Sequence, residues 1–557
     1  MEKGQIVTLT IEDMSSEGHG IGKLYEQDAA GNAEGRGFAV FVKDTVVGDR
    51  VKAELTRVKK HYAFGRVTEM LEASPDRIEA FCPYQGQCGG CPYGSLQYDA
   101  QLALKEKQVR EKLIRLGGLK DPAVMPIIGM EEEPFRYRSK AVMPVSTGGL
   151  LTQKGGIMKP VHEPQIGFYR AKTHDVVDCA DCLLQSEPAM AAADALRRFM
   201  EEDHITSYDP RWDKGLMRHL IVRTAAGTGE VMVILVVNGK AIPNAQKLIR
   251  MLDEAIYAIP VYEEGPLAGV EWNLESVVLN SNKSKRLDGP ILGEECITIA
   301  GKPTITEEAG GLQFEISPLS FYQVNREQMM RLYEKALEYA DLKGGETVLD
   351  LYCGVGTIGL FAAAEMNRKA AEAAAGNREP DTSAEEQKQG CVIGIESIKG
   401  AVLDANRNAV INGIVNARYV CGKAEEELPK MVRTKAQEEQ AVREAASQYG
   451  EDAARKEVLK DESLRIEHAD VVILDPPRAG CETSLLEAVV KTAPDRIVYV
   501  SCDPATLARD IKWLGEHGYE FREATPCDMF PWTGHTESIA LLSKLHTKQN
   551  MDVWNWK

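Results

Sequence analysis

Two side chains near the carboxyl end of the chain have the chemistry of a nucleophile and a base. Cys502 follows a strand-like apolar run, Ile497–Val500, and precedes Asp503 and Pro504 in a turn. Glu537 lies in "GHTESIALL", just before the last apolar run. A cysteine at a strand end is more often a small packed residue, but as a thiolate it is a nucleophile, and a nearby carboxylate is a candidate base. The two residues therefore form a candidate catalytic pair.

A thiolate and a carboxylate together suit methylation of carbon 5 of a uracil ring. This carbon is a poor nucleophile. A thiolate that adds to carbon 6 converts the ring to an enolate, so carbon 5 can attack a methyl sulfonium, and a base must then remove the carbon-5 proton before the thiolate leaves. The reaction needs one cysteine, one carboxylate and a methyl donor around one base. Cys502 and Glu537 supply the first two.

A glycine loop provides a candidate site for the methyl donor. In "VLDLYCGVGTIGL" an apolar strand is followed by Gly354 and Gly356, and Gly359 opens a helix, which lets a nucleotide-like ligand approach the backbone. Glu396 ends the next strand, at a place where a carboxylate typically binds ribose hydroxyls, although an insertion stretches the usual spacing of ~20 residues. The third glycine that favours a pyrophosphate is missing. The pattern therefore predicts a nucleoside site, with S-adenosylmethionine favoured over NAD.

A third motif, "VVILDPPRAG", places Asp475 and two prolines at the end of a buried strand. A rigid loop beside the cofactor is the functional interpretation, and a simple proline turn is the structural one. Similar loops serve enzymes that methylate amino groups, so this motif alone leaves the target atom open. An amino-group methyltransferase would leave Cys502 without a role.

Cysteines near residue 90 form a candidate metal site. Cys82, Cys88 and Cys91 are close in sequence, and Cys179 or Cys182 supplies a fourth ligand. The N-terminus lacks the features of a signal peptide, so we expect a cytoplasmic protein, in which such thiols bind metal more often than they form disulfides. Their spacing leaves zinc and an iron–sulfur cluster both open.

The elements that must position these residues fall into three regions. Short alternating runs with glycine turns predict a small OB-like β-barrel, and strands mixed with glycine loops then suggest an antiparallel α+β region. After it, strands alternate with helices as in a parallel doubly wound sheet, which binds ligands at the carboxyl ends of its strands. The predicted division is 1–72 for the barrel, 73–321 for a central α+β domain, 322–545 for an α/β Rossmann-like domain with acidic insertions near 366–390 and 429–466, and 546–557 for a tail.

The net charge of −18 argues against a nucleic-acid partner until its distribution is considered. Both insertions are acidic, whereas Arg50–Arg66 carries six basic residues and one acid, with Tyr62 and Phe64 between them. This stretch is either a nucleic-acid platform or a solvated edge strand. No apolar run reaches the ~18–20 residues of a membrane span, so no membrane association is expected.

The motifs "CPYQGQCGGC", "FYQVN", "LDLYCGVGTIGL", "LDPPRAG", "YVSCDPATLARD" and "HTESIALL" resemble the bacterial RNA uracil-5-methyltransferases, especially their 23S ribosomal RNA branch. The resemblance covers nearly the whole chain. It implies an N-terminal TRAM barrel, a central domain with a [4Fe-4S] cluster and a C-terminal class I methyltransferase domain.

The resemblance also implies residue roles, with Cys502 as the nucleophile and Glu537 as the base that removes the carbon-5 proton. Thr357 stands where some members have asparagine. The implied S-adenosylmethionine contacts are Gln323, Tyr352, Gly354, Thr357, Glu396 and Asp475. The implied cluster ligands are Cys82, Cys88, Cys91 and Cys182, the last because "CLLQ" matches the family's cysteine followed by apolar residues.

The sequence therefore predicts S-adenosylmethionine-dependent methylation of carbon 5 of a uridine in 23S ribosomal RNA, through a covalent bond between Cys502 and carbon 6. The target base is expected to be flipped out of its stack. One alternative is a methyltransferase of the transfer-RNA T-loop uridine, which the cysteines disfavour. The other is a non-catalytic iron–sulfur RNA-binding protein. No obligate protein partner is evident.

Overall fold

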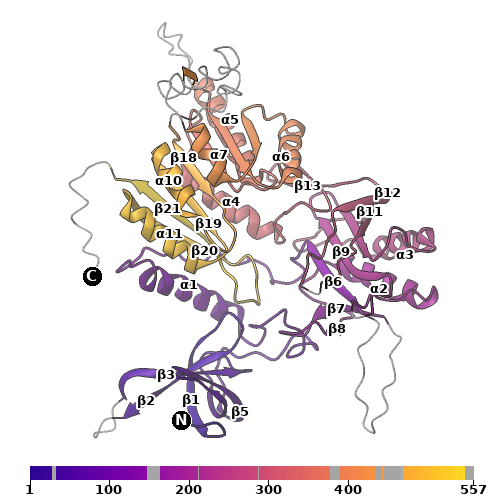
Figure 1. Ribbon diagram of the computed structural model, residues 1–557, viewed down its shortest axis with the longest axis vertical. Coiled ribbons are helices and arrows are strands. Elements are labelled where there is room, and N and C mark those ends of the chain that lie inside the picture. Colours follow the sequence, from indigo (N-terminus) through magenta and orange to yellow (C-terminus); the bar gives the residue numbers. More distant parts are fainter. Residues whose placement is uncertain are drawn as a thin grey trace.

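The computed structural model describes residues 1–27, 33–146, 164–210, 212–286, 288–376, 389–432, 442–443, 466 and 468–545. Most of the two predicted acidic insertions and the whole predicted tail lie outside these residues. A small barrel, a central domain and a larger α/β domain are arranged around a long helix, α1 (Tyr98–Arg115) (Figure 1). Among the described residues, no helix is both long and apolar enough to cross a membrane.

The N-terminal region is a closed five-stranded barrel with the order β1-β2-β3-β5-β4, which confirms the predicted barrel. Buried and exposed positions alternate along β1, so that Val7, Leu9 and Ile11 point into the barrel core, as expected for a strand with one face in the core. The strands are β1 (Ile6–Met14), β2 (Gly20–Gln27), β3 (Ala33–Lys43), β4 (Arg50–Val58) and β5 (Tyr62–Glu72).

The central region contains a seven-stranded sheet with the order β12-β11-β10-β9-β6-β7-β8. The sheet is antiparallel except for the pair β10 and β11, and α2 and α3 pack on it. A separate hairpin, β13 and β14, follows. The elements are β6 (Lys140–Ser146), β7 (Gln165–Tyr169), β8 (Val176–Asp178), α2 (Glu187–Glu202), β9 (Met217–Ala225), β10 (Glu230–Val237), α3 (Ala245–Tyr257), β11 (Asn273–Ser281), β12 (Glu295–Gly301), β13 (Ile305–Ala309) and β14 (Leu312–Ile316).

The C-terminal region is a seven-stranded sheet with the order β17-β16-β15-β18-β19-β21-β20. Its first five strands are parallel, which agrees with the predicted parallel sheet, although only four of the five, β15, β16, β18 and β19, were predicted as strands. β21 runs antiparallel to both β19 and β20. The strands are β15 (Thr347–Leu351), β16 (Cys391–Glu396), β17 (Ala417–Cys421), β18 (Val471–Leu474), β19 (Arg496–Ser501), β20 (Tyr519–Cys527) and β21 (Glu537–Lys544).

Helices cover both faces of this sheet. One hydrophobic core packs α4, α5 and α6 against it, and a second core packs α7, α10 and α11, together with α1, against the opposite face. The helices are α4 (Arg326–Ala340), α5 (Thr357–Gly376), α6 (Lys399–Ile411), α7 (Ala424–Met431), α10 (Thr483–Thr492) and α11 (Pro504–Glu516). This doubly wound arrangement exposes the carboxyl ends of the parallel strands at one edge.

A buried ion pair ties α1 to the loop between β20 and β21. The Lys105 ammonium donates to Asp528 Oδ1 at 2.5 Å and to the Phe530 carbonyl at 3.1 Å, and neither Lys105 nor Asp528 is exposed to solvent. In the same loop, the Trp532 indole donates to the Pro134 carbonyl at 2.9 Å. Because the loop ends at Glu537, these contacts fix the segment that delivers this carboxylate.

Breaking the ion pair is expected to destabilise the protein. Lys105→Met leaves Asp528 as an uncompensated buried carboxylate, so we expect the free energy of unfolding to fall by about 3–5 kcal/mol. Lys107→Met is the matched control, because Lys107 on the same helix is exposed and its ion pairs contribute about 0–1 kcal/mol. Urea unfolding midpoints at neutral pH measure both changes, and equally small shifts in the two variants would contradict the role given to Lys105.

Candidate active site and cysteine cavity

The carboxyl edge of the parallel sheet brings the sequence motifs together. Tyr352 follows β15, Glu396 ends β16, Asp475 follows β18 and Cys502 follows β19. These four strands are hydrogen-bonded to one another in parallel, so their carboxyl ends meet. Side chains that are as many as 150 positions apart in sequence therefore share one edge.

Glu537 reaches this edge from the opposite direction. β21 is antiparallel to β19, and its register pairs Ser501 with Ser538. The residue after Ser501 and the residue before Ser538 therefore lie side by side, and these residues are Cys502 and Glu537. The Cys502 thiol is half-buried, whereas Glu537 is only 5% exposed. The antiparallel last strand thus places a carboxyl group beside the thiol.

The electrostatics of the pair reflect this crowding. Burial, followed by the Glu537 and Asp475 carboxylates, raises the pKa of the Cys502 thiol to about 11. Burial, followed by Asp475, raises the pKa of Glu537 to about 8. The Arg478 guanidinium of the Asp-Pro-Pro loop opposes both shifts. At neutral pH the free site therefore holds a protonated thiol, and a positive charge placed among these groups would favour their ionised forms.

The acid next to Cys502 has a structural role. Asp503 caps α11, because its Oδ1 accepts a hydrogen bond from the Ala505 amide at 2.7 Å. The Ser501 hydroxyl donates to the Asp503 carbonyl at 3.0 Å and accepts from the Asp503 amide at 3.2 Å. These bonds fix the turn that presents Cys502.

A small cavity of about 30 Å³ lies at the end of β15. Five of the six predicted cofactor residues line it: Gln323, Tyr352, Gly354, Thr357 and Asp475. The sixth, Glu396, lies beside the cavity, since its Oε2 accepts a hydrogen bond from the Gly354 amide at 3.2 Å. The structure thus brings all six predicted residues together.

Asp350 and Tyr333 also line this cavity, and neither was predicted as a site residue from the sequence. Asp350 is 1% exposed, its Oδ1 has no hydrogen-bond partner, and burial followed by Asp475 raises its pKa to about 7. Tyr333 of α4 is also buried in the wall. The signal for Asp350 was present in "LDLYCGVGT", and that for Arg478, beside the thiol, was present in "VVILDPPRAG", whereas no motif marked Tyr333.

The glycine loop allows the close packing that this cavity requires. Gly359 donates its amide hydrogen to Asp350 Oδ2 at 2.9 Å, and a Cβ there would lie 2.6 Å from the same oxygen. Gly356 has φ +77°, and a Cβ there would meet the Tyr419 ring at 2.6 Å. Both positions therefore require glycine.

Five cysteines line a second cavity, of about 270 Å³, between the loop after the barrel and the central sheet. They are the four predicted ligands, Cys82, Cys88, Cys91 and Cys182, together with Cys179. Burial, followed by the charges of neighbouring cysteines, raises the pKa of the Cys91 thiol far above its usual range. Thiolates gathered in this way need a compensating positive charge, such as a metal site supplies.

Cys179 and Cys182 differ in their surroundings. Cys179 is 4% exposed, and its thiol hydrogen-bonds to the Asp181 carbonyl at 3.2 Å. Cys182 is only partly buried, and the neighbouring Cys179 together with the backbone amides of Leu184 and Gln185 lowers its pKa. Of the two thiols, Cys182 is therefore the more accessible and the more easily ionised.

The sulfur positions bear on the choice of metal. Four sulfurs around one tetrahedral zinc ion at ~2.3 Å would lie roughly 3.8 Å apart. In the described part of the chain, no three cysteine sulfurs lie within 4.8 Å of one another. A four-iron cluster separates its ligands more widely, because each thiolate binds a different iron. The cavity thus fits a cluster better than a single zinc ion.

Family models match both ends of the chain. Residues 1–68 match the TRAM domain, and residues 392–545 match a family described as tRNA (Uracil-5-)-methyltransferase. The fold and the edge site therefore define an S-adenosylmethionine-dependent methyltransferase that carries a TRAM barrel.

Related proteins align with nearly the whole length of this chain. An "Uncharacterized RNA methyltransferase" of Halalkalibacterium halodurans is 36% identical over 97% of this chain and 98% of its own length. One of Caldanaerobacter subterraneus subsp. tengcongensis is 37% identical over 97% and 99%. The chain belongs to the RNA methyltransferases of the uracil-5-methyltransferase family.

The solved structure of a Pyrococcus abyssi tRNA (uracil-54, C5)-methyltransferase in complex with S-adenosyl-L-homocysteine shares the fold. It has a TM-score of 0.63 and 24% identity, and the match covers 96% of this chain and 99% of that one.

Proposed function

We propose that this enzyme methylates carbon 5 of a uridine in 23S ribosomal RNA through a covalent bond between Cys502 and carbon 6. The observation that carries the proposal is the pairing of Ser501 with Ser538, which sets the thiol beside the Glu537 carboxyl group at the edge that holds the cofactor cavity. An enzyme that methylated an amino group would not need this pair.

The order of proton transfers follows from the pKa values. The Cys502 thiol must lose its proton to solvent before it attacks carbon 6, and its pKa of about 11 makes this unfavourable in the free site, whereas the positive charge of the methyl donor would favour the thiolate. After methyl transfer, Glu537 accepts the carbon-5 proton, and its raised pKa of about 8 makes it a stronger base than an ordinary carboxylate. Loss of this proton allows the bond between Cys502 and carbon 6 to break.

S-adenosylmethionine supplies the methyl group and a positive sulfonium charge. Glu396 would bind ribose hydroxyls, and the unpartnered Asp350 Oδ1 would accept a hydrogen bond from a donor on the cofactor. The enclosed 30 Å³ is smaller than a nucleoside, so the cavity would hold only part of the cofactor. Burial raises the pKa of Asp350 and Asp475 to about 7, which means that their negative charges are costly in this site. A positive charge on the cofactor would offset this cost, so the two carboxyl groups favour a cationic ligand.

The barrel supplies a surface that suits RNA. The Phe41, Tyr62 and Phe64 rings lie 5.6–5.8 Å apart, and His19 contacts Phe64 at 6.2 Å. Stacking on such rings binds unpaired bases, while the basic residues of Arg50–Arg66 attract phosphates. This surface supports the nucleic-acid interpretation over a solvated edge strand.

The cysteine cavity would hold a [4Fe-4S] cluster through Cys82, Cys88, Cys91 and Cys182. Methyl transfer from a sulfonium needs no redox step, so the cluster would serve the structure of the central domain.

We expect Cys182→Ser to lose most of its iron and sulfide after purification without oxygen, because one ligand is removed. Cys179→Ser is the matched control and should keep both, because Cys179 is buried and its thiol hydrogen-bonds to the Asp181 carbonyl. Chemical iron and sulfide analysis measures the result. If Cys182→Ser retains iron and Cys179→Ser loses it, the fourth ligand of the cluster is Cys179 and not Cys182.

A transfer-RNA substrate is the second candidate, favoured by the structural likeness to the Pyrococcus abyssi enzyme. Incubating the enzyme with S-adenosylmethionine and unmodified transcripts of 23S ribosomal RNA and transfer RNA separates the two. The proposal predicts 5-methyluridine in the ribosomal transcript alone. If 5-methyluridine forms only in transfer RNA, the substrate is transfer RNA and not 23S ribosomal RNA, while the proposed chemistry remains the same.

A further inference from the structure

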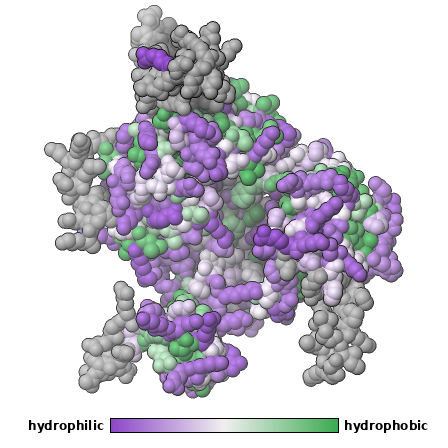
Figure 2. Space-filling model, in the orientation of Figure 1, coloured by the Kyte–Doolittle hydropathy of each residue, from purple (hydrophilic) through white to green (hydrophobic). Residues whose placement is uncertain are grey.

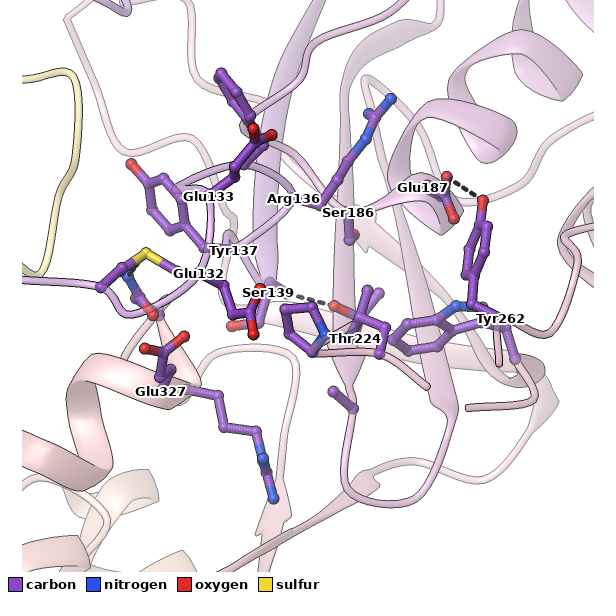
Figure 3. A pocket seen from close by; sticks show the side chains of 18 of the residues that line it. Glu132, Glu133, Arg136, Tyr137, Ser139, Ser186, Glu187, Thr224, Tyr262 and Glu327 are labelled. Atoms are coloured by element: carbon purple, nitrogen blue, oxygen red, sulfur yellow. Dashed lines mark hydrogen bonds between the residues drawn. The ribbon is translucent and has the colours of Figure 1, made fainter. Parts of the chain in front are cut away.

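A cavity of about 450 Å³ lies between the central domain and the start of α4 (Figure 3). It shares no lining residue with the cofactor cavity. The two are neighbours, because the Ser139 hydroxyl on its wall donates to the Gln323 carbonyl at 3.3 Å. The space-filling view shows the surface hollowed between the same two domains, with hydrophobic atoms in the hollow (Figure 2). No step of the proposed reaction uses this cavity.

The lining is strongly acidic, with six glutamates and two arginines. Both arginines are already paired, Arg136 with Asp181 at 2.8 Å and Arg326 with Glu307 at 3.3 Å. Three glutamates are exposed at the cavity and form no ion pair with any described residue: Glu132, Glu133 and Glu264. A phosphate or carboxylate ligand would be repelled here, and a cation would be attracted.

Two buried acceptors in the wall lack partners. The Ser186 hydroxyl has no hydrogen-bond partner, although Ser186 is only 4% exposed. The neighbouring Glu187 accepts from the Tyr262 hydroxyl at Oε1 (2.7 Å), but its buried Oε2 has no partner. A buried carboxylate oxygen without a donor is costly, so this part of the cavity is suited to a ligand that donates N–H groups.

The remaining walls are apolar and aromatic. Trp272 and Tyr137 are buried behind the cavity surface, and Phe135, Pro266 and Leu267 complete the wall. Methylene groups pack on such a surface, and an ammonium group is attracted to the face of an aromatic ring.

The distribution of the acids excludes two other kinds of cation. In the described part of the chain, the one group of three carboxylate or histidine ligands close enough to share a metal ion lies elsewhere, at His468, Asp470 and Asp495. The glutamates of this cavity are divided between the buried wall, with Glu187 and Glu307, and the exposed rim, and no three of them are close enough to share one metal ion. A quaternary ammonium ion carries no N–H group and would leave Ser186 and Glu187 without donors.

We propose that this cavity binds an aliphatic polyamine, a chain of methylene groups that carries two or more primary or secondary ammonium groups. One ammonium donates to Glu187 Oε2 and the Ser186 hydroxyl. The methylenes lie against the aromatic wall, and a second ammonium meets the unpaired glutamates at the rim. Such a ligand offsets negative charge between the two domains, next to the segment that carries Gln323.

Equilibrium dialysis of the full-length protein with labelled putrescine and spermidine, at physiological salt and without RNA, tests this site. We expect one saturable site per chain. Glu187→Gln should weaken binding at least tenfold, and Glu264→Gln, an exposed change that leaves the fold intact, should weaken it several-fold. Glu254→Gln on α3 is the matched control, an exposed acid outside the cavity, and should leave binding unchanged.

Three results would overturn the proposal. The first is the absence of saturable binding. The second is an equal loss in the Glu254→Gln control, which would mean diffuse attraction to a chain with a net charge of −18. The third is binding of choline as tight as that of putrescine, because choline lacks the N–H donors. Since the measurement uses neither RNA nor methyl donor, its outcome is independent of the proposed function.

Discussion

Cys502→Ala is expected to lose RNA methylation by a factor on the order of 10⁴ or more, because carbon 5 of an unactivated uracil does not attack a sulfonium at a useful rate. Among the described residues, no accessible cysteine near Cys502 replaces its thiol, because Cys527, which pairs with Glu537 across β20 and β21, is fully buried. Cys353 and Cys481 are buried, and Cys481 accepts a hydrogen bond from the Tyr499 hydroxyl at 3.5 Å in the network that supports α11. The measurement is single-turnover transfer of labelled methyl groups to RNA.

The variant should still bind the methyl donor, because Cys502 does not line the cofactor cavity. Cys296→Ala is the matched control, a half-buried cysteine on β12 of the central sheet, and should retain normal activity. Methylation by Cys502→Ala at a rate near that of the unmodified enzyme would contradict the covalent mechanism and would favour the alternative, an enzyme that methylates an amino group.

Glu537→Gln is expected to separate the two halves of the reaction. The amide is nearly isosteric but does not accept the carbon-5 proton, so the methylated base should remain bonded to Cys502. We expect turnover to fall by roughly 10²–10⁴ while a protein–RNA adduct accumulates. Denaturing gel electrophoresis after reaction with labelled RNA detects this adduct.

The pH profile provides an independent check on the same residue. A base must be deprotonated to act, and Glu537 acts after methyl transfer, so kcat, which includes breakdown of the adduct, should rise with pH through about 8, the raised pKa of Glu537. Glu537→Gln should lose this rise. If the variant turns over normally and forms no adduct, Glu537 is not the base, and another carboxylate of the site, such as Asp475, becomes the candidate.

The parallel part of the C-terminal sheet was predictable because its strands are continuous apolar runs between helical segments. β17 and β20 were not predicted. The sequence of β17 (ARYVC) is short, and that of β20 (YEFREATPC) mixes charges with a proline, so neither resembles a buried strand. The parallel pair of β10 and β11 was also unexpected, because α3 between them is followed by a long loop that obscures the crossover.

In the candidate site, too, some features could be predicted from the sequence and others could not. The residues at the strand ends could be predicted from motifs, since each motif follows its own strand. The adjacency of Cys502 and Glu537 could not be predicted in this way, because it depends on the direction and register of β21, which no local pattern encodes. Tyr333 and the polyamine cavity come from segments that only the tertiary fold brings together, and single residues on such segments carry no signature in sequence.

The most direct test of the central claim uses 23S ribosomal RNA with 5-fluorouridine in place of uridine. Fluorine takes the place of the carbon-5 proton, so Glu537 has no proton to remove and the base stays bonded to Cys502. We therefore expect a protein–RNA adduct that survives denaturation, requires S-adenosylmethionine and is absent from Cys502→Ala. An adduct that persists in Cys502→Ala, or none at all with enzyme that binds the methyl donor and methylates the natural RNA, would contradict nucleophilic attack by Cys502.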